Sequence, residues 1–310
     1  MKPQRILIHI ALFLVTLFTT TVAGVEWLNL DPFNLVNFHR GLPFSLSILA
    51  ILTCHEFGHY FAARYHGIDA TLPFYIPFPN YPGLLNFGTL GAVIRTRTPI
   101  PSRKAMFDVG VAGPIAGFIV SLGVLAYGFL HLPEADFILS IHPDYFHPTA
   151  PAGLGLALGN SLVYKAFSFF LTDPSKQFVP PMSEMYHYHY LLAGWFGIFV
   201  TAMNLLPVGQ LDGGHITYAM FGPRHRIISR IVFGFVLTLG ILGALPLLGV
   251  IVPFGWLGWF FWAVVLLFVI KLDHPPVEDE TPLDAMRMNL GWIALLILII
   301  SFIPTPFLVM

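Results

Sequence analysis

The chain has 310 residues, of which 56% are hydrophobic and 10% are charged, with a net charge of -1. Water-soluble domains carry about 25% charged residues and disordered chains are poor in hydrophobic residues, so this composition excludes both classes, and the charge excludes a basic nucleic-acid-binding protein. A multi-span membrane protein remains. Because Cys54 is its single cysteine, histidine and carboxylate groups must hold any bound metal.

Seven hydrophobic runs follow one another along the chain, each close to the roughly 20 residues that a helix needs to cross a bilayer. They comprise residues 6–25, 42–64, 105–130, 190–207, 227–248, 254–270 and 290–308. The first run follows Lys2 and Arg5, but its apolar core exceeds the roughly 7 to 15 residues of a secretory signal, so we expect it to be retained. The pattern predicts an all-α polytopic membrane protein with about seven transmembrane helices.

The positions of lysine and arginine predict the orientation, since positively charged loops stay on the cytoplasmic side. With the N-terminus inside, all but three of the 15 lysine and arginine residues lie in inner segments. The three exceptions are Arg40, Lys165 and Lys176. We therefore expect a multi-pass integral membrane protein with a cytoplasmic N-terminus.

Two connections between the predicted helices are unusual. Residues 71–101 contain six prolines, which no continuous helix tolerates, yet the segment is hydrophobic and includes the strand-like run 88–94. We expect a re-entrant loop with a β-hairpin at the membrane interface. The outer connection, residues 131–188, contains a hydrophobic stretch at 153–171 that is a candidate for an eighth span.

The sequence His55-Glu56-Phe57-Gly58-His59 lies near the cytoplasmic end of the second predicted helix. Residues four apart share one helix face, so His55 and His59 present two imidazoles together with Glu56 beside them. This H-E-x-x-H pattern holds zinc through both histidines and leaves the glutamate free as a general base. The alternative is a polar patch for helix packing, but ionisable groups within a membrane are costly and usually functional.

A hydrolytic zinc site uses three protein ligands and one open position, which requires a third ligand elsewhere. Asp212 is the candidate, because it ends the segment 204–212 at the close of the fourth run, where Pro207 and several glycines should unwind the helix. Exposed backbone at membrane depth is tolerated where it lines a wet cavity. The alternative is an ordinary helix-ending turn with a capping aspartate.

Together the two motifs resemble the site-2 protease family of intramembrane zinc metalloproteases. This family pairs H-E-x-x-H on one transmembrane helix with N-x-x-P-x-x-x-x-D-G on a later one, and Asn204, Pro207, Asp212 and Gly213 match the second pattern. Residues 113–117, Gly-Pro-Ile-Ala-Gly, resemble the G-P element of the intervening helix. No stretch between the third and fourth helices is long or polar enough for a PDZ domain, which is similar to the branch of the family without this module that is found in bacteria and in chloroplasts. The resemblance implies a bacterial inner membrane as the location.

The resemblance implies a role for each matching residue. His55, His59 and Asp212 would hold one catalytic Zn²⁺, Glu56 would act as the catalytic base, and Asn204 would lie near the scissile carbonyl. A buried asparagine that satisfies unwound backbone is the alternative for Asn204, and His215 suits either task.

We expect hydrolysis of transmembrane protein segments near the cytoplasmic side, in contact with the lipid bilayer and without nucleic acid. The single membrane domain would cover residues 1–310, with a catalytic core at 42–215 and peripheral helices at 1–25 and 227–310. The run 88–94 serves either substrate binding by strand addition or the structural hairpin alone. A metal-ion or proton-coupled transporter is the competing function, since such proteins also carry ionisable groups within the membrane.

The chemistry also decides between seven and eight spans. Asp212 reaches the same zinc as the two histidines only if its helix runs in the same direction as theirs, because the hydrocarbon layer is about 30 Å thick. Residues 153–171 should therefore lie on or dip into the outer leaflet without crossing it.

Three further features have simpler predicted roles. Asp108 is expected to cap the third helix or to pair with Arg103 or Lys104. Residues 186–190 alternate tyrosine with histidine, which is typical of an interfacial aromatic belt. The acidic run 278–280 is interpreted as a solvated loop.

Overall fold

The computed structural model describes residues 3–79, 86–146, 155–250 and 252–309. Four of the described helical stretches are long and hydrophobic enough to cross a membrane. These are Ile6–Glu26, Leu35–Tyr65, Arg103–Leu130 and Asp212–Leu248. The chain is therefore a mostly helical integral membrane protein, and the total of seven spans stays a prediction.

The other three expected spans are shorter helices in the structure. They are α6 (His189–Asn204), the stretch Gly258–Ile270 and α10 (Ala285–Ser301). The fourth predicted run ends earlier than expected, at Asn204, because Pro207 has no backbone N–H to continue the helix. The helix of the last predicted run begins earlier than expected, at Ala285, and ends at Ser301. Pro304 prevents its continuation, and the chain then forms the strand Phe307–Val309.

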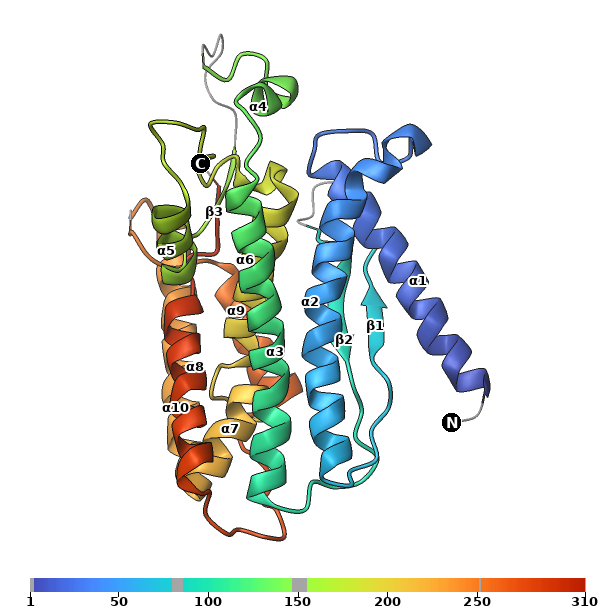
Figure 1. Cartoon of the computed structure of the whole chain (residues 1–310). Helices are drawn as coiled ribbons and strands as arrows, with labels where there is room; N and C mark the ends of the chain where they lie inside the picture. Colours follow the sequence, from blue (N-terminus) through green and yellow to red (C-terminus); the bar gives the residue numbers. More distant parts are fainter. Residues whose placement is uncertain (1–2, 80–85, 147–154, 251, 310) are drawn as a thin grey trace.

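Three long helices lie side by side (Figure 1). α2 (Phe38–Tyr65) packs against α1 (Pro3–Glu26) on one side and α3 (Arg103–Leu130) on the other. α3 packs in turn against α6, whose Trp195 is fully buried and donates from its indole N–H to the Gly159 carbonyl at 2.7 Å. The remaining helices are α4 (Asp136–Ile141), α5 (Leu162–Leu171), α7 (Asp212–Phe221), α8 (His225–Ala244), α9 (Gly258–Val264) and the π-helical turn Val265–Ile270, with short 3-10 turns at Leu35–Asn37, Met185–His187, Gly222–Arg224 and Leu245–Leu248.

The proline-rich connection forms the expected β-hairpin. Strand β1 (Phe74–Pro77) pairs antiparallel with β2 (Thr89–Val93), with Tyr75 opposite Ala92. The hairpin runs alongside α2 and also contacts α1 (Figure 1). Residues 80–85 lie outside the described residues, and the placement of the segment at the membrane interface stays a prediction.

The described part of the hydrophobic stretch 153–171 forms a short strand and a short helix. β3 (Leu156–Leu158) pairs antiparallel with β4 (Phe307–Val309). α5 has 10 residues, which gives a length of about 15 Å at 1.5 Å per residue, half of a bilayer core. This part therefore contains no helix long enough to span, and its position relative to the membrane surface stays a prediction.

The aromatic run 186–190 at the start of α6 is buried at its centre, and its position at a membrane interface stays a prediction. His187 and Tyr188 are 1% and 5% exposed. His187 donates from Nδ1 to the Trp27 carbonyl, and His189 donates from Nε2 to the Gly24 carbonyl at 2.8 Å. These bonds satisfy carbonyls at the end of α1, where a helix has no partners of its own.

Candidate metal centre

Two buried histidines of α2 lie one helical turn apart. His55 and His59 are 6% and 7% exposed, and their Nε2 atoms are 3.0 Å apart. The spacing of four residues brings both rings to the face of α2 that packs against α3 and α6. Each ring therefore offers one nitrogen to a common point between the helices.

Asp212 brings a carboxylate to the same point from a distant part of the chain. It is the first residue of α7, and its Oδ2 atom lies 3.4 Å from Nε2 of both histidines. Ligand atoms about 2.1 Å from a tetrahedral zinc ion are about 3.4 Å apart. The triangle of two nitrogens and one oxygen therefore fits a zinc ion, with one coordination position left for water.

The turn between α6 and α7 positions Asp212. The helix stops at Asn204 and the chain turns through Pro207 and Gly209, whose φ of +50° is a conformation that favours glycine. A side chain on Gly209 would also overlap the Lys271 carbonyl. The turn lets the start of α7 point back toward α2, so that the unwound backbone lies beside the metal cavity.

Backbone and glycine contacts from α3 hold the imidazoles in place. His59 donates from Nδ1 to the Val109 carbonyl at 2.7 Å, which leaves Nε2 available for a metal, as is usual for ligating histidines. A methyl group on Gly113 would overlap the His59 ring, and one on Gly117 would lie 3.1 Å from Nδ1 of His55. The Gly-Pro-Ile-Ala-Gly element therefore provides the space that the two rings occupy.

The other two predicted site residues line the same cavity, which has a volume of about 560 Å³. Glu56 is 6% exposed, and its carboxylate accepts a hydrogen bond from the Ile94 backbone. Asn204 places Nδ2 3.3 Å from Nε2 of His55. The structure thus brings all five predicted site residues together around one cavity.

His274 also lines this cavity, and the sequence analysis missed it. Its Nε2 lies 2.8 Å from Nδ1 of His215, and its ring stacks on Tyr218 with the centroids 4.4 Å apart. Burial lowers the pKa of His274. The sequence feature that could have indicated His274 is its position before two prolines, just after a hydrophobic run. His215 lines the same cavity, and its ring is hydrogen-bonded to this second histidine.

Residues 278–280 are exposed, as expected of a solvated loop, but Glu280 also connects the loop of residues 271–284 to the helix bundle. Glu280 forms an ion pair with Arg103 of α3 and accepts a hydrogen bond from the Tyr218 hydroxyl at 2.6 Å. Partial burial acts to raise the pKa of Glu280, but the bonds from Tyr218 and Arg103 outweigh it and lower the pKa. The negative charge of Glu280 therefore holds the loop over the cavity.

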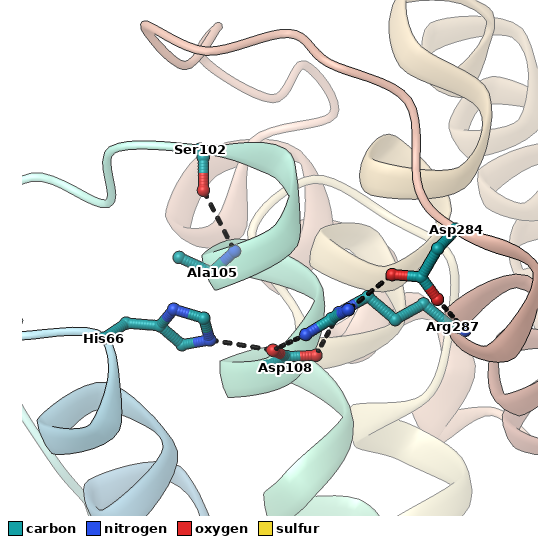
Figure 2. A network of polar contacts seen from close by, with 6 residues as sticks. All are labelled: His66, Ser102, Ala105, Asp108, Asp284 and Arg287. Atoms are coloured by element: carbon teal, nitrogen blue, oxygen red, sulfur yellow. Dashed lines mark hydrogen bonds and ion pairs between the residues drawn. The ribbon is translucent and has the colours of Figure 1, made fainter.

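Asp108 has different partners from those expected. It accepts two hydrogen bonds from Arg287 of α10, at 2.8 and 2.7 Å, and lies 2.7 Å from Nε2 of His66 (Figure 2). Ser102 caps α3 instead, through its bond from the Ala105 amide. The planar guanidinium of Arg287 matches the carboxylate in two places, and Arg103 pairs with Glu280 instead.

A buried triangle of two histidines and a carboxylate between hydrophobic helices defines a membrane-embedded metalloprotein. The chain belongs to peptidase family M50, whose match covers residues 43–247. This match confirms the resemblance to site-2 proteases, and it includes both motifs and the glycines of α3.

Several named relatives are zinc metalloproteases of plants. The chain is 30% identical over 301 residues to the probable zinc metalloprotease EGY2, chloroplastic, of Oryza sativa subsp. indica, a match that covers 94% of this chain and 49% of the relative. It is 28% identical over 302 residues to the protein of the same description from Arabidopsis thaliana, covering 95% and 48%. It is 29% identical over 266 residues to the probable zinc metalloprotease EGY1, chloroplastic, of Oryza sativa subsp. japonica, covering 85% and 40%.

The chain therefore spans about half the length of the curated relatives that it matches. Their descriptions place them in chloroplasts, so they give no support to the expected bacterial inner membrane.

Proposed function

We propose that the chain is an intramembrane zinc metalloprotease that hydrolyses peptide bonds of membrane-embedded protein segments near the cytoplasmic side. The supporting observation is that His55, His59 and Asp212 form a zinc-sized triangle. Glu56 lines the same cavity without belonging to the triangle. A zinc ion held there supplies Lewis-acid activation of water and of the substrate carbonyl.

Three residues of the chain have separate roles in the proposed reaction. Glu56 takes a proton from the attacking water as the new C–O bond forms, and returns it to the leaving nitrogen as the C–N bond breaks. Asn204 donates from Nδ2 to the substrate carbonyl oxygen, where negative charge develops. Val109 holds His59 in the orientation that directs Nε2 toward the ion.

Strand β2 is the proposed binding surface for the unwound substrate. Ala92, Val93 and Ile94 line the cavity, and among the described residues β2 pairs with β1 alone. An extended peptide can add to such an edge through backbone hydrogen bonds. A helical substrate must unwind first, because an intact helix uses its carbonyls internally.

The proposed catalytic core comprises residues 42–215. Residues from the C-terminal part of the chain also line its cavity. These are residues 274–277, so the region 227–310, expected to be peripheral, contributes to the cavity lining. His59 precedes the end of α2 by six residues, which is about 9 Å along the helix. If the N-terminus is cytoplasmic, as predicted, the end of α2 lies on the cytoplasmic side, and cleavage takes place near that side of the membrane.

The test is Glu56→Gln in the full chain, measured with two single-span test proteins. One carries an Asn-Pro pair near the cytoplasmic end of its span and the other an uninterrupted leucine span. We expect the wild type to cleave only the first, and Glu56→Gln to keep its zinc while cleavage falls at least a hundredfold. Glu26→Gln, an exposed position at the end of α1, is the matched control. Unchanged cleavage in Glu56→Gln would refute the assigned base.

The competing transporter hypothesis predicts a different result in the cleavage assay. A transporter would move ions across vesicles without cutting either test protein. Photocrosslinking from Val93, which is 49% exposed, provides a second test, since a substrate strand on β2 must react there. A crosslinker at Leu14, 55% exposed on α1, should not capture the test protein.

A further inference from the structure

A second cluster of two histidines and one carboxylate lies at the other end of α6. His142 directly follows α4, and Glu184 and His187 lie at the 3-10 turn just before α6. α6 contains 16 residues, so about 24 Å of helix separates this cluster from Asn204 at the first site. The two clusters therefore cannot share an ion.

The geometry of this cluster repeats that of the first site. Nε2 of His142 lies 3.1 Å from Nε2 of His187, and Oε2 of Glu184 lies 3.5 and 3.6 Å from these two nitrogens. The corresponding distances at the first site are 3.0, 3.4 and 3.4 Å. Both triangles match the spacing of about 3.4 Å between ligands of a tetrahedral zinc ion.

The orientation of His187 is fixed in the way that metal ligands require. Its Nδ1 donates to the Trp27 carbonyl, just as Nδ1 of His59 donates to the Val109 carbonyl. With its proton on Nδ1, the neutral ring carries a lone pair on Nε2. A backbone carbonyl that accepts a hydrogen bond from the other ring nitrogen is usual for ligating histidines.

One oxygen of the Glu184 carboxylate has no hydrogen-bond partner among the described residues. This oxygen is Oε2, which is buried. Burial of an acceptor without a partner is unfavourable, because the group loses its hydrogen bonds to water. A cation at the centre of the triangle would satisfy this oxygen and both imidazole nitrogens at once.

We propose that His142, Glu184 and His187 bind a second divalent transition-metal ion. Two imidazoles and one carboxylate suit Zn²⁺ in particular. The ion would join the segment after α4 to the start of α6 and, through Trp27, to the end of α1. Its role is structural, because it ties together three parts of the chain that are distant in sequence.

The test counts zinc ions on the full chain, purified in detergent, stripped with a chelator and titrated with Zn²⁺. We expect the wild type to bind two ions per chain. His55→Asn/Asp212→Asn should retain one, which reports on the second site without altering it. His142→Asn/Glu184→Gln should also retain one, and Zn²⁺ affinity at the second site should fall more than tenfold. Glu134→Gln, an exposed change in the same connection, should keep both ions.

Thermal unfolding gives an independent readout. Zn²⁺ should raise the melting temperature of the His55→Asn/Asp212→Asn protein, and His142→Asn/Glu184→Gln in that background should remove the effect. A wild type that binds one ion, or a His142→Asn/Glu184→Gln protein that still binds two, would overturn the proposal. In both cases the cluster would be a hydrogen-bonded packing contact.

Discussion

His59 packs directly against Gly113, so that a methyl group at Gly113 would overlap the imidazole. The two residues come from neighbouring helices, α2 and α3, whose backbones approach closely at this level. Small residues permit such approach between membrane helices. The contact makes the position of a candidate metal ligand depend on a residue that binds nothing itself.

Gly113→Ala should therefore displace His59 and reduce zinc binding. We expect at least a tenfold loss of zinc affinity at the first site and a destabilisation of about 1 to 3 kcal/mol from overpacking. Gly123→Ala in the same helix is the control, because a methyl group there meets no described atom within 4 Å. Equal zinc binding by the two variants would contradict this account of the helix contact.

Removal of the metal ion from the site of His55, His59 and Asp212 should lower the stability of the folded protein. A bound ion at 100 times its Kd stabilises the folded state by about 2.7 kcal/mol. Asp212→Asn replaces a charged oxygen ligand by a neutral amide, so this variant should lose one zinc ion per chain and melt at a lower temperature. A chelator should then shift its melting temperature less than that of the wild type. Asp136→Asn, at an exposed position of α4, should behave like the wild type.

Asp108→Asn should loosen the junction of α3 with α10. Arg287 makes two charge-assisted hydrogen bonds to this carboxylate, and both side chains are partly exposed, at 22% and 29%. We expect a loss of about 1 to 2 kcal/mol, after allowance for solvent screening. Arg287→Gln in the Asp108→Asn background should add little further loss. Additive losses in calorimetry would mean that the two residues do not act as a pair.

The pH dependence of stability should reveal the Glu280 contact. Its pKa in the folded state is lowered, so the stabilisation is complete above the ordinary glutamate pKa of about 4.3 and is lost as the pH falls through the lower value. Glu280→Gln should therefore melt at a lower temperature than the wild type at pH 7, and the difference should shrink as the pH falls through the lowered pKa of Glu280. Glu278→Gln, exposed in the same loop, should match the wild type throughout.

The sequence alone determined the membrane class, the hairpin in the proline-rich connection and the family. Hydrophobic run length reports the bilayer thickness directly. The H-E-x-x-H spacing places two imidazoles on one helix face through the geometry of a single element. The second motif identified Asp212 because its residues are contiguous. Each of these inferences depends on the geometry of a single helix or strand, which follows directly from the spacing of residues in the sequence.

Only the tertiary structure decided which distant residues meet. Arg287 reaches Asp108 across 179 positions of sequence, and Glu280 reaches Arg103 across 177. No local pattern encodes such pairings, because they depend on how helices pack and where loops cross. The same reason explains why His274 at the cavity and the cluster of His142, Glu184 and His187 were not foreseen: packing, and not spacing, brings these side chains together.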